Sequence, residues 1–430
     1  MRPVEETVSP ASVARRVFVK SGAVGLFSLG LDPLFLARAV HGTVGRHRTA
    51  GASDRAILVC LFQRGAVDGL SMVVPHGDAT YYRERPRIAV PRSDVIDLDG
   101  HFGLHPRLAP LKPLWDAGTL AVVHAVGSPD PTRSHGDAQD YLETGTPGVK
   151  ATPDGWANRY CTSAAQHDAT PFRAVAFGPQ LPRLLAGSAP TLAIDDLQTF
   201  GLPARRPAAR DKLTAAFEGL YEGAATGLLA PSGVEARVAI EMLKRAEPAR
   251  YAPADGAEYP AGRLGRSLRQ IAQIIKADVG LEIAFADVTG WDTHVNQGGS
   301  QGSLATRLDE LGRALGAFTR DLGERMRNVV VLTMSEFGRT VKENGNAGTD
   351  HGHATAMLVL GGPVNGGKVL GRWPGLDPVA RFEGRDLAVT TDVRDLFGEL
   401  LARHLGAADL HAVFPGRGAD PARFPGVLRA

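Results

Sequence analysis

The chain is poor in cysteine, in net charge and in long apolar runs. Its two cysteines, Cys60 and Cys161, give neither a disulfide framework nor a cysteine metal cluster. A formal net charge of only +2 gives no reason to expect a nucleic-acid partner held by bulk electrostatics. With 43% hydrophobic and 22% charged residues, the composition is ordinary for a globular protein. The length of 430 residues suffices for one large domain or two smaller ones.

The N-terminal segment, residues 1–40, lacks an apolar stretch long and unbroken enough to span a membrane. It carries a pair of arginines at 15–16, then Phe18 and Lys20, then a mostly apolar stretch that reaches the small-x-small sequence at 37–39. This order resembles a twin-arginine export signal. It predicts recognition by the twin-arginine export machinery and a periplasmic or secreted location. The alternatives are an amphipathic leader and an uncleaved anchor.

Six apolar runs of strand length follow a polar, glycine-rich linker at residues 41–54. They lie at residues 56–62, 120–126, 172–178, 281–288, 328–334 and 356–362. Valine, isoleucine, leucine and alanine fill these runs without clean alternation. That pattern is typical of strands buried on both faces, as in a largely parallel sheet covered by helices.

Helical patterns separate the apolar runs. Leucine and phenylalanine recur at helical spacing over residues 304–326, and residues 262–280 and 393–406 show a similar pattern. Strand, helix and strand in succession predict an α/β fold, a three-layer sandwich with the sheet between helices. Residues 55–430 are expected to form this domain. The alanine-rich stretch at about 181–280 is expected to be a helical insertion or cap.

Polar residues of the kinds used in catalysis collect next to the apolar runs. The candidates are Asp68 after the first run, Thr132, Arg133, Ser134 and His135 after the second, Asp292 and His294 after the fourth, Glu336 and Arg339 after the fifth, and His351 and His353 before the sixth. In open α/β sheets, ligands bind at the carboxyl ends of the strands. We therefore expect these side chains to converge on one edge of the sheet.

A cluster of carboxylates and imidazoles predicts a metal site. Several acids in one place need a cation to offset their mutual repulsion. This donor set suits one or two divalent ions such as zinc, manganese, iron, magnesium or calcium, and it does not suit a soft thiolate site. Two such ions could clamp a phosphate or sulfate group between them.

Each candidate also has a structural explanation when it is taken alone. Asp68 could form a turn in its glycine loop, and Glu336 could pair with Arg339. Ser134 could cap the helix that follows it, and a single imidazole such as His294 more often serves the structure than a metal. Together, these explanations require several coincidences at strand ends, so a functional site is favoured.

Several segments of the chain resemble a known family. The segments "FQRGAVDGLSMVVP", "TGWDTHVNQG" and "SEFGRT", with "GTDHGHA" and "LVLGG" after it, resemble the exported bacterial family called domain of unknown function 1501. The resemblance runs from the arginine pair to about residue 415. This family is similar in fold to the alkaline phosphatase and sulfatase superfamily. The resemblance therefore implies a mixed, mainly parallel sheet between helical layers, with one or two metals at the strand ends.

The resemblance also implies roles for individual residues. Metal ligands are implied at Asp68, Asp292, His294, Glu336, His351 and His353. A nucleophile is implied at Thr132 or Ser134. The chain departs from the superfamily at Phe337, which follows Glu336 where an Asp-His pair is usual. No cysteine stands where sulfatases carry formylglycine, so a formylglycine sulfatase is disfavoured.

These observations predict an exported metal-dependent hydrolase of phosphate or sulfate esters that acts on a small molecule or a glycan. Ser134 or Thr132 would attack the phosphorus or sulfur atom. Arg133 or Arg339 would hold the non-bridging oxygens. His135 would protonate the leaving group or serve as another ligand. The alternative is a non-catalytic envelope protein on the same scaffold that binds a glycan or protein partner.

Overall fold

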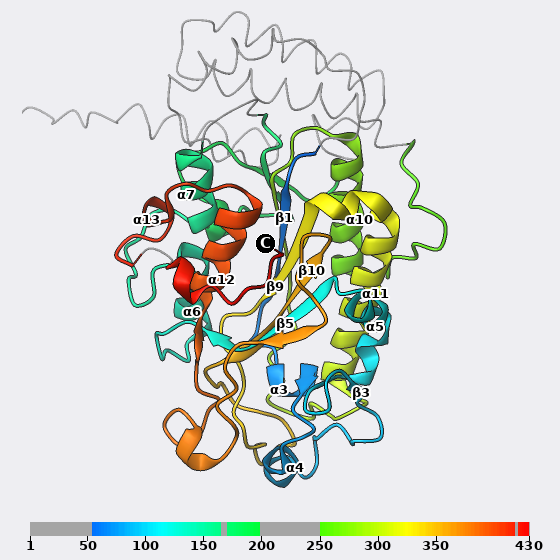
Figure 1. Ribbon diagram of the computed structural model, residues 1–430, viewed down its shortest axis with the longest axis vertical. Helices are drawn as coiled ribbons and strands as arrows, with labels where there is room; N and C mark the ends of the chain where they lie inside the picture. The colour runs from blue at the N-terminus through cyan, green and yellow to red at the C-terminus, as the bar shows by residue number, and fades with distance from the viewer. Residues whose placement is uncertain (1–53, 165–169, 198–249, 418–419, 430) are drawn as a thin grey trace, which may run out of the picture.

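A large sheet runs through the middle of the molecule (Figure 1). The structure is a computed structural model that describes residues 54–164, 170–197, 250–417 and 420–429. The predicted export signal at residues 1–40 and the linker up to residue 53 lie outside the described residues. No helix in the described part of the chain is long and apolar enough to cross a membrane.

Within the described part of the chain, nine strands form this sheet in the order β11, β5, β10, β9, β1, β8, β6 and β7, with β12 beside β5. Their bounds are β1 Ile57–Gln63, β5 Leu120–Gly127, β6 Ala174–Phe177, β7 Leu192–Ile194, β8 Ile283–Val288, β9 Val329–Met334, β10 Thr355–Gly361, β11 Lys368–Leu370 and β12 Thr391–Asp392. All six predicted apolar runs are strands of this sheet, which confirms that part of the sequence prediction.

One strand of the sheet runs against the others. β10 pairs antiparallel with β5 and β9, whereas the other recorded pairs are parallel. The amino end of β10 therefore lies at the same edge as the carboxyl ends of its neighbours. The loop at 348–354, which precedes β10, meets the loops that follow β5, β9, β1 and β8 at this edge. The sheet is mixed and mainly parallel, as predicted.

Helices cover both faces of the sheet and complete a three-layer α/β sandwich (Figure 1). One face carries α5 Lys112–Asp116, α10 Arg263–Ala277 and α11 Ser303–Leu322, and the other carries α6 His135–Thr144, α7 Trp156–Ser163, α12 Val393–Glu399 and α13 Leu410–Val413. The three predicted helices are confirmed as α10, as α11 with a 3-10 turn at Gly323–Asn328, and as α12 with a π turn at Leu400–His404.

The two faces of β1 show why its sequence does not alternate. Val59 and Leu61 belong to the core on the side of α10 and α11, whereas Leu58, Cys60 and Phe62 belong to the core on the other side. Successive side chains of a strand point to opposite faces of a sheet. A strand with helices on both sides is therefore apolar throughout. Cys60 is a buried free thiol.

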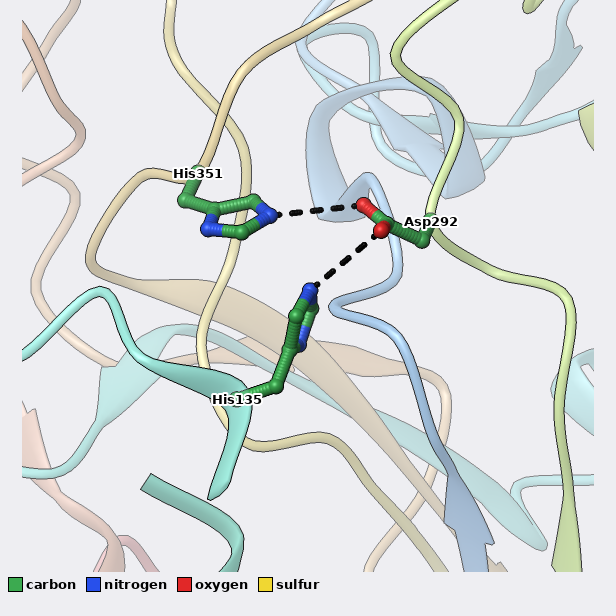
Figure 2. Close-up of side chains that lie close together, drawn as sticks. All are labelled: His135, Asp292 and His351. Carbon is green, nitrogen blue, oxygen red and sulfur yellow. Dashed lines mark ion pairs between the residues drawn. The ribbon is translucent and has the colours of Figure 1, made fainter. Parts of the chain in front are cut away.

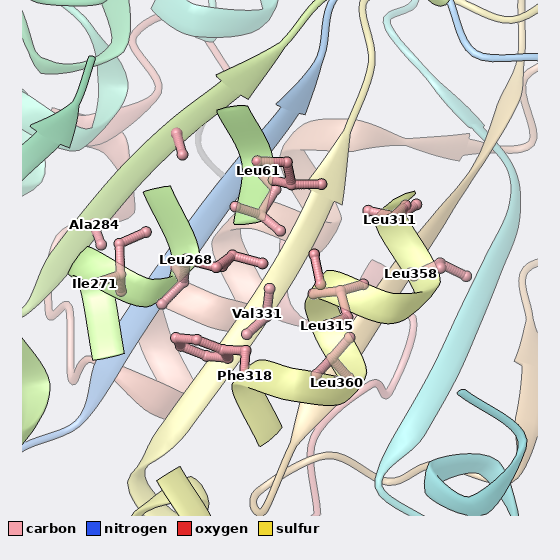
Figure 3. Packing of buried hydrophobic residues seen from close by; sticks show 14 of the residues in the cluster. Leu61, Leu268, Ile271, Ala284, Leu311, Leu315, Phe318, Val331, Leu358 and Leu360 are labelled. Carbon is pink, nitrogen blue, oxygen red and sulfur yellow. The ribbon is translucent and has the colours of Figure 1, made fainter. Parts of the chain in front are cut away.

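The apolar stripe of α11 packs on the sheet. Leu311, Leu315 and Phe318 are buried and lie in one cluster with Val331 of β9 and Leu358 of β10 (Figure 3). Their spacing of three and four residues places them on one side of the helix. Burying a side chain of this size stabilises the fold by about 1.5–3 kcal/mol.

Shorter elements complete the described part of the chain. They are α3 Gly69–Met72, α4 Ala79–Glu84, and a small sheet of β2 Val73–Val74, β4 Gly103–Leu104 and β3 Ile96–Asp97. Further 3-10 helices lie at Pro106–Leu111, Arg183–Leu185, Pro378–Ala380 and Pro421–Arg423. The stretch predicted as a helical insertion is described only at its flanks. β7 lies near its start and α10 at its end, whereas residues 198–249 lie outside the described residues.

Candidate metal centre

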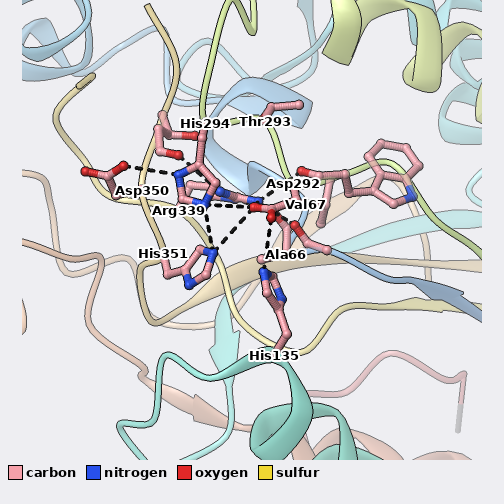
Figure 4. A network of polar contacts seen from close by, with 12 residues as sticks. Ala66, Val67, His135, Asp292, Thr293, His294, Arg339, Asp350 and His351 are labelled. Carbon is pink, nitrogen blue, oxygen red and sulfur yellow. Dashed lines mark hydrogen bonds and ion pairs between the residues drawn. The ribbon is translucent and has the colours of Figure 1, made fainter. Parts of the chain in front are cut away.

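Three imidazoles gather around the carboxylate of Asp292 at the carboxyl edge of the sheet. Nε2 of His135 lies 3.4 Å from Oδ2 of Asp292, and Nε2 of His351 lies 3.4 Å from Oδ1 (Figure 2). Nε2 of His294 lies 3.0 Å from the same Oδ1 and 2.9 Å from Nε2 of His351 (Figure 4). The structure thus brings together four of the residues predicted for the site.

These four residues come from three loops at one edge. His135 is the first residue of α6, which follows β5, and Ser134 caps that helix through its side chain. Asp292 and His294 follow β8, whereas His351 precedes β10. The reversed direction of β10 is the reason that His351 reaches a site otherwise built from strand exits.

Gly65, directly after β1, allows the loops to pack closely. Its φ is 115°, a conformation that side chains rarely adopt, and a Cβ atom there would lie 2.8 Å from the backbone nitrogen of Asp292. Its N–H donates to Oε1 of Glu336 at 2.8 Å. A glycine at this position therefore joins the loops after β1, β8 and β9.

The second ring nitrogen of each imidazole is held by an oxygen atom. Nδ1 of His135 lies 2.9 Å from Oε1 of Glu336. Nδ1 of His294 lies 3.1 Å from Oδ1 of Asp350, and Nδ1 of His351 lies 2.8 Å from a backbone carbonyl oxygen. Carboxylates and carbonyls only accept hydrogen bonds, so these partners place the proton on Nδ1 of each ring. A ring that carries its proton on Nδ1 alone presents the lone pair of Nε2, which is the orientation of metal-binding imidazoles.

Two features of the cluster fit a divalent cation. Nε2 of His135 is buried and has no hydrogen-bond partner. Nε2 of His294 and Nε2 of His351 face each other at 2.9 Å. Because both rings hold their protons on Nδ1, this contact opposes two lone pairs, and a cation between them would turn the repulsion into attraction. Three imidazole nitrogens and a carboxylate suit zinc or another first-row transition ion.

Arg339 holds the carboxylate of Asp292 in place. Its guanidinium is fully buried and donates to Oδ1 of Asp292 at 2.5 Å. The other N–H groups donate to the carbonyl oxygens of Ala66 at 2.7 Å and Thr349 at 3.0 Å. Burial by itself raises the pKa of Asp292, but Arg339, together with His294 and His135, keeps that pKa below its ordinary value. In this structure the guanidinium of Arg339, for which a role on ester oxygens was predicted, is engaged by Asp292 and by backbone carbonyl oxygens.

Glu336 holds an imidazole instead of contacting the centre of the cluster. Its side chain is buried, and Oε1 accepts from His135 and from Nε2 of Gln139 at 2.8 Å. Burial alone raises the pKa of Glu336, but the hydrogen bonds from His135 and Gln139 lower it overall. The same hydrogen bond raises the pKa of His135, whereas burial lowers the pKa of His351. In this arrangement Glu336 contacts the ring of His135 and not the carboxylate at the centre of the cluster.

Asp68 lies apart from the imidazoles and pairs with a guanidinium. Arg85 donates to Oδ2 at 2.6 Å and to Oδ1 at 3.0 Å, and Gln297 donates to Oδ2 at 2.6 Å. The side chains of Asp68 and Arg85 are both fully buried. Arg85 thus supplies the positive charge that the sequence analysis assigned to a metal, and it leaves Asp68 unavailable to an ion in this arrangement.

His353 is also placed away from the cluster. Its Nε2 donates to the carbonyl oxygen of Ser128 at 3.0 Å, and its ring packs against Phe382 with centroids 4.4 Å apart. Burial lowers the pKa of His353. The ring serves the loop packing in this structure.

The predicted nucleophiles and Arg133 have other partners. Ser134 uses its hydroxyl as the cap of α6, and the hydroxyl of Thr132 accepts from the backbone N–H of Ser134 at 3.2 Å. The guanidinium of Arg133 donates to Glu383 and to Asp386, each at 2.7 Å. Only the backbone of Arg133 touches the cluster, because its carbonyl oxygen holds Nδ1 of His351.

The cluster is open to solvent on one side. The exposed fractions of the side chains are 29% for His135, 44% for Asp292, 38% for His294 and 23% for His351. His135, Asp292 and His351 offer three candidate ligand atoms within 4.8 Å of one another, and Nε2 of His294 lies 3.0 Å from Oδ1 of Asp292. An ion at this place would be accessible to a small molecule.

Two positioning residues were not predicted as parts of the site. Asp350 directly precedes His351 but contacts His294, and no spacing rule relates residues 294 and 350. Gln139 could have been found, because it lies four residues after His135 on α6. Residues four apart share a helix face, and both side chains reach Glu336.

The fold and the site define a three-layer α/β protein with a candidate site for a divalent ion at the carboxyl edge of its sheet. Residues 204–424, more than half of the chain, match the family described as "Protein of unknown function (DUF1501)". The chain belongs to this family, which confirms the family predicted from its motifs. No curated protein sequence matches the chain.

Several solved structures are distantly similar. The sulfatase PsFucS1 from Pseudoalteromonas sp. is 12% identical, with coverage of 96% of this chain and 81% of that chain and a TM-score of 0.42. The zinc complex of the C-terminal periplasmic domain of EcEptC from Escherichia coli is 9% identical, with coverage of 73% and 75% and a TM-score of 0.37. The phosphonate monoester hydrolase of Agrobacterium radiobacter is 11% identical, with coverage of 85% and 78% and a TM-score of 0.30.

Proposed function

We propose that the chain is a metal-dependent hydrolase of phosphate or sulfate esters that uses one divalent ion. The observation that carries the proposal is the convergence of three Nε2 atoms on Asp292, each from a ring whose Nδ1 is held by oxygen. His135, His294, His351 and Asp292 would hold the ion. When bound, such an ion acts as a Lewis acid on an ester oxygen and lowers the pKa of an attacking water.

The remaining residues of the site would orient these ligands. Glu336 would keep His135 in its tautomer, and Asp350 would do the same for His294. Arg339 would hold Asp292 so that Oδ2 stays directed towards His135. Preorganisation of this kind removes the reorganisation that binding would otherwise require.

Two observations favour one ion and an attack by water. Asp68, one of the six ligands predicted for one or two ions, already has its charge balanced by Arg85. The hydroxyl of Ser134 caps α6, and the hydroxyl of Thr132 accepts from the backbone N–H of Ser134. We therefore favour a water molecule over either hydroxyl as the nucleophile, and zinc, iron or manganese over magnesium or calcium as the ion.

A second candidate function is a non-catalytic protein that keeps the ion for structure or for binding a glycan or protein partner. The engagement of both predicted guanidiniums favours it, because Arg133 and Arg339 pair with carboxylates of the chain itself. The exposure of the cluster favours the hydrolase.

Metal analysis and ester turnover test the proposal. The purified protein is expected to carry about one transition ion per chain and to hydrolyse 4-nitrophenyl phosphate or sulfate in a chelator-sensitive way. His294→Gln and Asp292→Asn should lose both the ion and turnover, whereas His411→Gln, at an exposed histidine of α13, is the matched control. A bound ion without turnover on a broad ester panel would favour the second candidate. A protein that neither carries nor takes up a transition ion would contradict both.

We also propose that the protein is exported by the twin-arginine route to the periplasm or beyond. The support is the order of residues in the N-terminal segment, where the arginines at 15–16 precede Phe18 and Lys20. Export in a folded state suits a protein that acquires its ion before it leaves the cytoplasm. Replacing both arginines by lysine should retain the protein in the cytoplasm, which cell fractionation would show; unchanged export would argue against this route.

A further inference from the structure

A cleft of about 310 Å³ lies at the same edge of the sheet as the candidate metal centre. Its lining comes from the carboxyl ends of three parallel strands, from the loop after β6 and from the start of α10. Its lining includes Arg64, Phe177, Leu181, Arg263, Phe285 and Asp287. Clefts of this size accommodate small organic molecules.

The charged groups of the cleft balance one another. Oδ2 of Asp287 accepts from Arg64 at 2.6 Å, and Oδ1 accepts from Arg263 at 2.7 Å. Arg64 also pairs with Glu143 at 2.8 Å. Two guanidiniums and two carboxylates leave no excess charge for a second anionic group. They do place N–H donors beside oxygen acceptors, and the side chain of Arg263 is 44% exposed, so its remaining donors are accessible to a ligand.

The accessible apolar part of the lining is contributed by Pro179, which is exposed, and by Leu181, which is half-buried, whereas Phe177 and Phe285 are almost fully buried in the core. The exposed Gln180 adds a polar side chain. A ligand that matches this lining has apolar faces and an edge of groups that both donate and accept hydrogen bonds. A sugar ring has these properties, because its hydroxyls do both and its C–H faces pack on apolar side chains such as Pro179 and Leu181.

Hydrogen bonds connect the cleft to the candidate metal centre. Nη1 of Arg64 donates to Oε1 of Gln139 at 2.9 Å, and Nε2 of Gln139 donates to Oε1 of Glu336 at 2.8 Å. The same Oε1 accepts from His135. In addition, the backbone N–H of Gly65, the residue that follows Arg64, donates to Oε1 of Glu336 at 2.8 Å. The cleft and the cluster are therefore neighbours on the sheet edge, joined through Gln139 and Glu336.

We propose that this cleft binds the sugar ring of a glycan ester whose phosphate or sulfate group lies at the metal centre. The inference rests on the proposed function for the ester group. Sugar binding itself needs only the side chains of the cleft. The probe can therefore be an unesterified sugar, and its binding can be measured without turnover.

Saturation-transfer NMR on the purified protein, before and after chelation, tests the inference. The probes are the methyl glycosides of glucose, galactose, fucose and N-acetylglucosamine. At least one is expected to bind in both states. Arg263→Gln should weaken that binding by about ten-fold, because it removes charge-assisted donors. Leu181→Asn, which alters the apolar wall, should also weaken it.

Arg266→Gln is the matched control, since Arg266 is an exposed arginine one turn along α10 that does not line the cleft. Failure of every glycoside to bind the wild-type protein, or equal binding by Arg263→Gln, would overturn the inference. Binding of 4-nitrophenol but of no glycoside would identify an aromatic site and would overturn it as well. Glycoside binding in a protein without metal or turnover would support the sugar site while ending the hydrolase proposal. Metal-dependent turnover without glycoside binding would do the reverse.

Discussion

Asp68 and Asp292 are two carboxylates that follow neighbouring parallel strands, β1 and β8, at one edge of the sheet. Asp68 is fully buried, and a guanidinium fork neutralises it. Asp292 also touches an arginine, but it is 44% exposed and faces the Nε2 atoms of three imidazoles. The residues that pack around an acid at a strand end therefore decide its state. Asp68 forms a closed pair, buried with its arginine, whereas Asp292 belongs to an open cluster, exposed beside imidazoles as a candidate ligand.

The largest expected effect concerns the closed pair. Arg85→Met would leave the buried carboxylate of Asp68 without its cation, so we expect the free energy of unfolding to fall by about 3–5 kcal/mol. Urea denaturation followed by circular dichroism measures this loss. Asp292→Asn serves as the comparison and should change the free energy of unfolding far less, because Asp292 is partly exposed. Equal losses in the two variants would contradict the distinction between the pairs.

The next largest effect concerns the open cluster. Glu336→Gln weakens the acceptor that orients His135, so we expect the affinity for a transition ion to fall by about 10- to 100-fold. Competition with a chromogenic chelator measures this affinity. Glu343→Gln, at another glutamate paired with an arginine but outside the cluster, is the control. An unchanged affinity in Glu336→Gln would mean that Glu336 does not orient a ligand.

Lowering the pH should weaken the pair of Asp68 and Arg85, because it protonates Asp68. Burial raises its pKa, but Arg85 outweighs burial and leaves the pKa of folded Asp68 below its ordinary value. Such a group stabilises the fold above its unfolded pKa of about 3.9, and the contribution is lost as the pH falls through the folded value. We therefore expect wild-type stability to decline more steeply below about pH 4 than that of the double variant Asp68→Asn/Arg85→Met. Urea titrations of both proteins across this pH range measure the free energy of unfolding. An identical decline in the wild-type protein and in the double variant would refute the prediction.

The smallest expected effect is that of Asp350→Asn. The side chain of Asp350 is 53% exposed, so water screens its interaction with His294. We expect the affinity for the ion to fall only a few-fold, less than in Glu336→Gln, when both are measured by the same competition. A loss larger than that of Glu336→Gln would show that exposure does not rank the two carboxylates.

The fold could be predicted from local patterns because a strand that is buried on both faces must be apolar along its whole length. The six runs became β1, β5, β6, β8, β9 and β10, and the helical stretches became α10, α11 and α12. The direction of β10 could not be predicted in this way. The residues of an apolar run look the same whichever way the strand runs in the sheet. Nothing local therefore distinguishes a parallel from an antiparallel strand.

For the candidate site, the sequence could predict which residues lie near the strand ends but not which of them contact one another. Asp292, His294, His351 and His135 lie together, which agrees with convergence at the strand ends. Glu336, Arg339 and Asp68 are of the expected residue types, but they contact a ring, a carboxylate and a guanidinium respectively. Residue type is a property of the sequence, whereas the partner of each charge depends on residues brought from distant segments.

Local periodicity and apolar content specify which segments are strands and helices, because they decide which faces a segment can bury. The order of residues along the chain also puts acids and imidazoles beside strand ends. The reversal of β10, the pairing of Arg85 with Asp68 and the gathering of three imidazoles around Asp292 arise only when the chain is folded. Electrostatic pairing depends on distance in space and on burial, and neighbours along the chain set neither quantity.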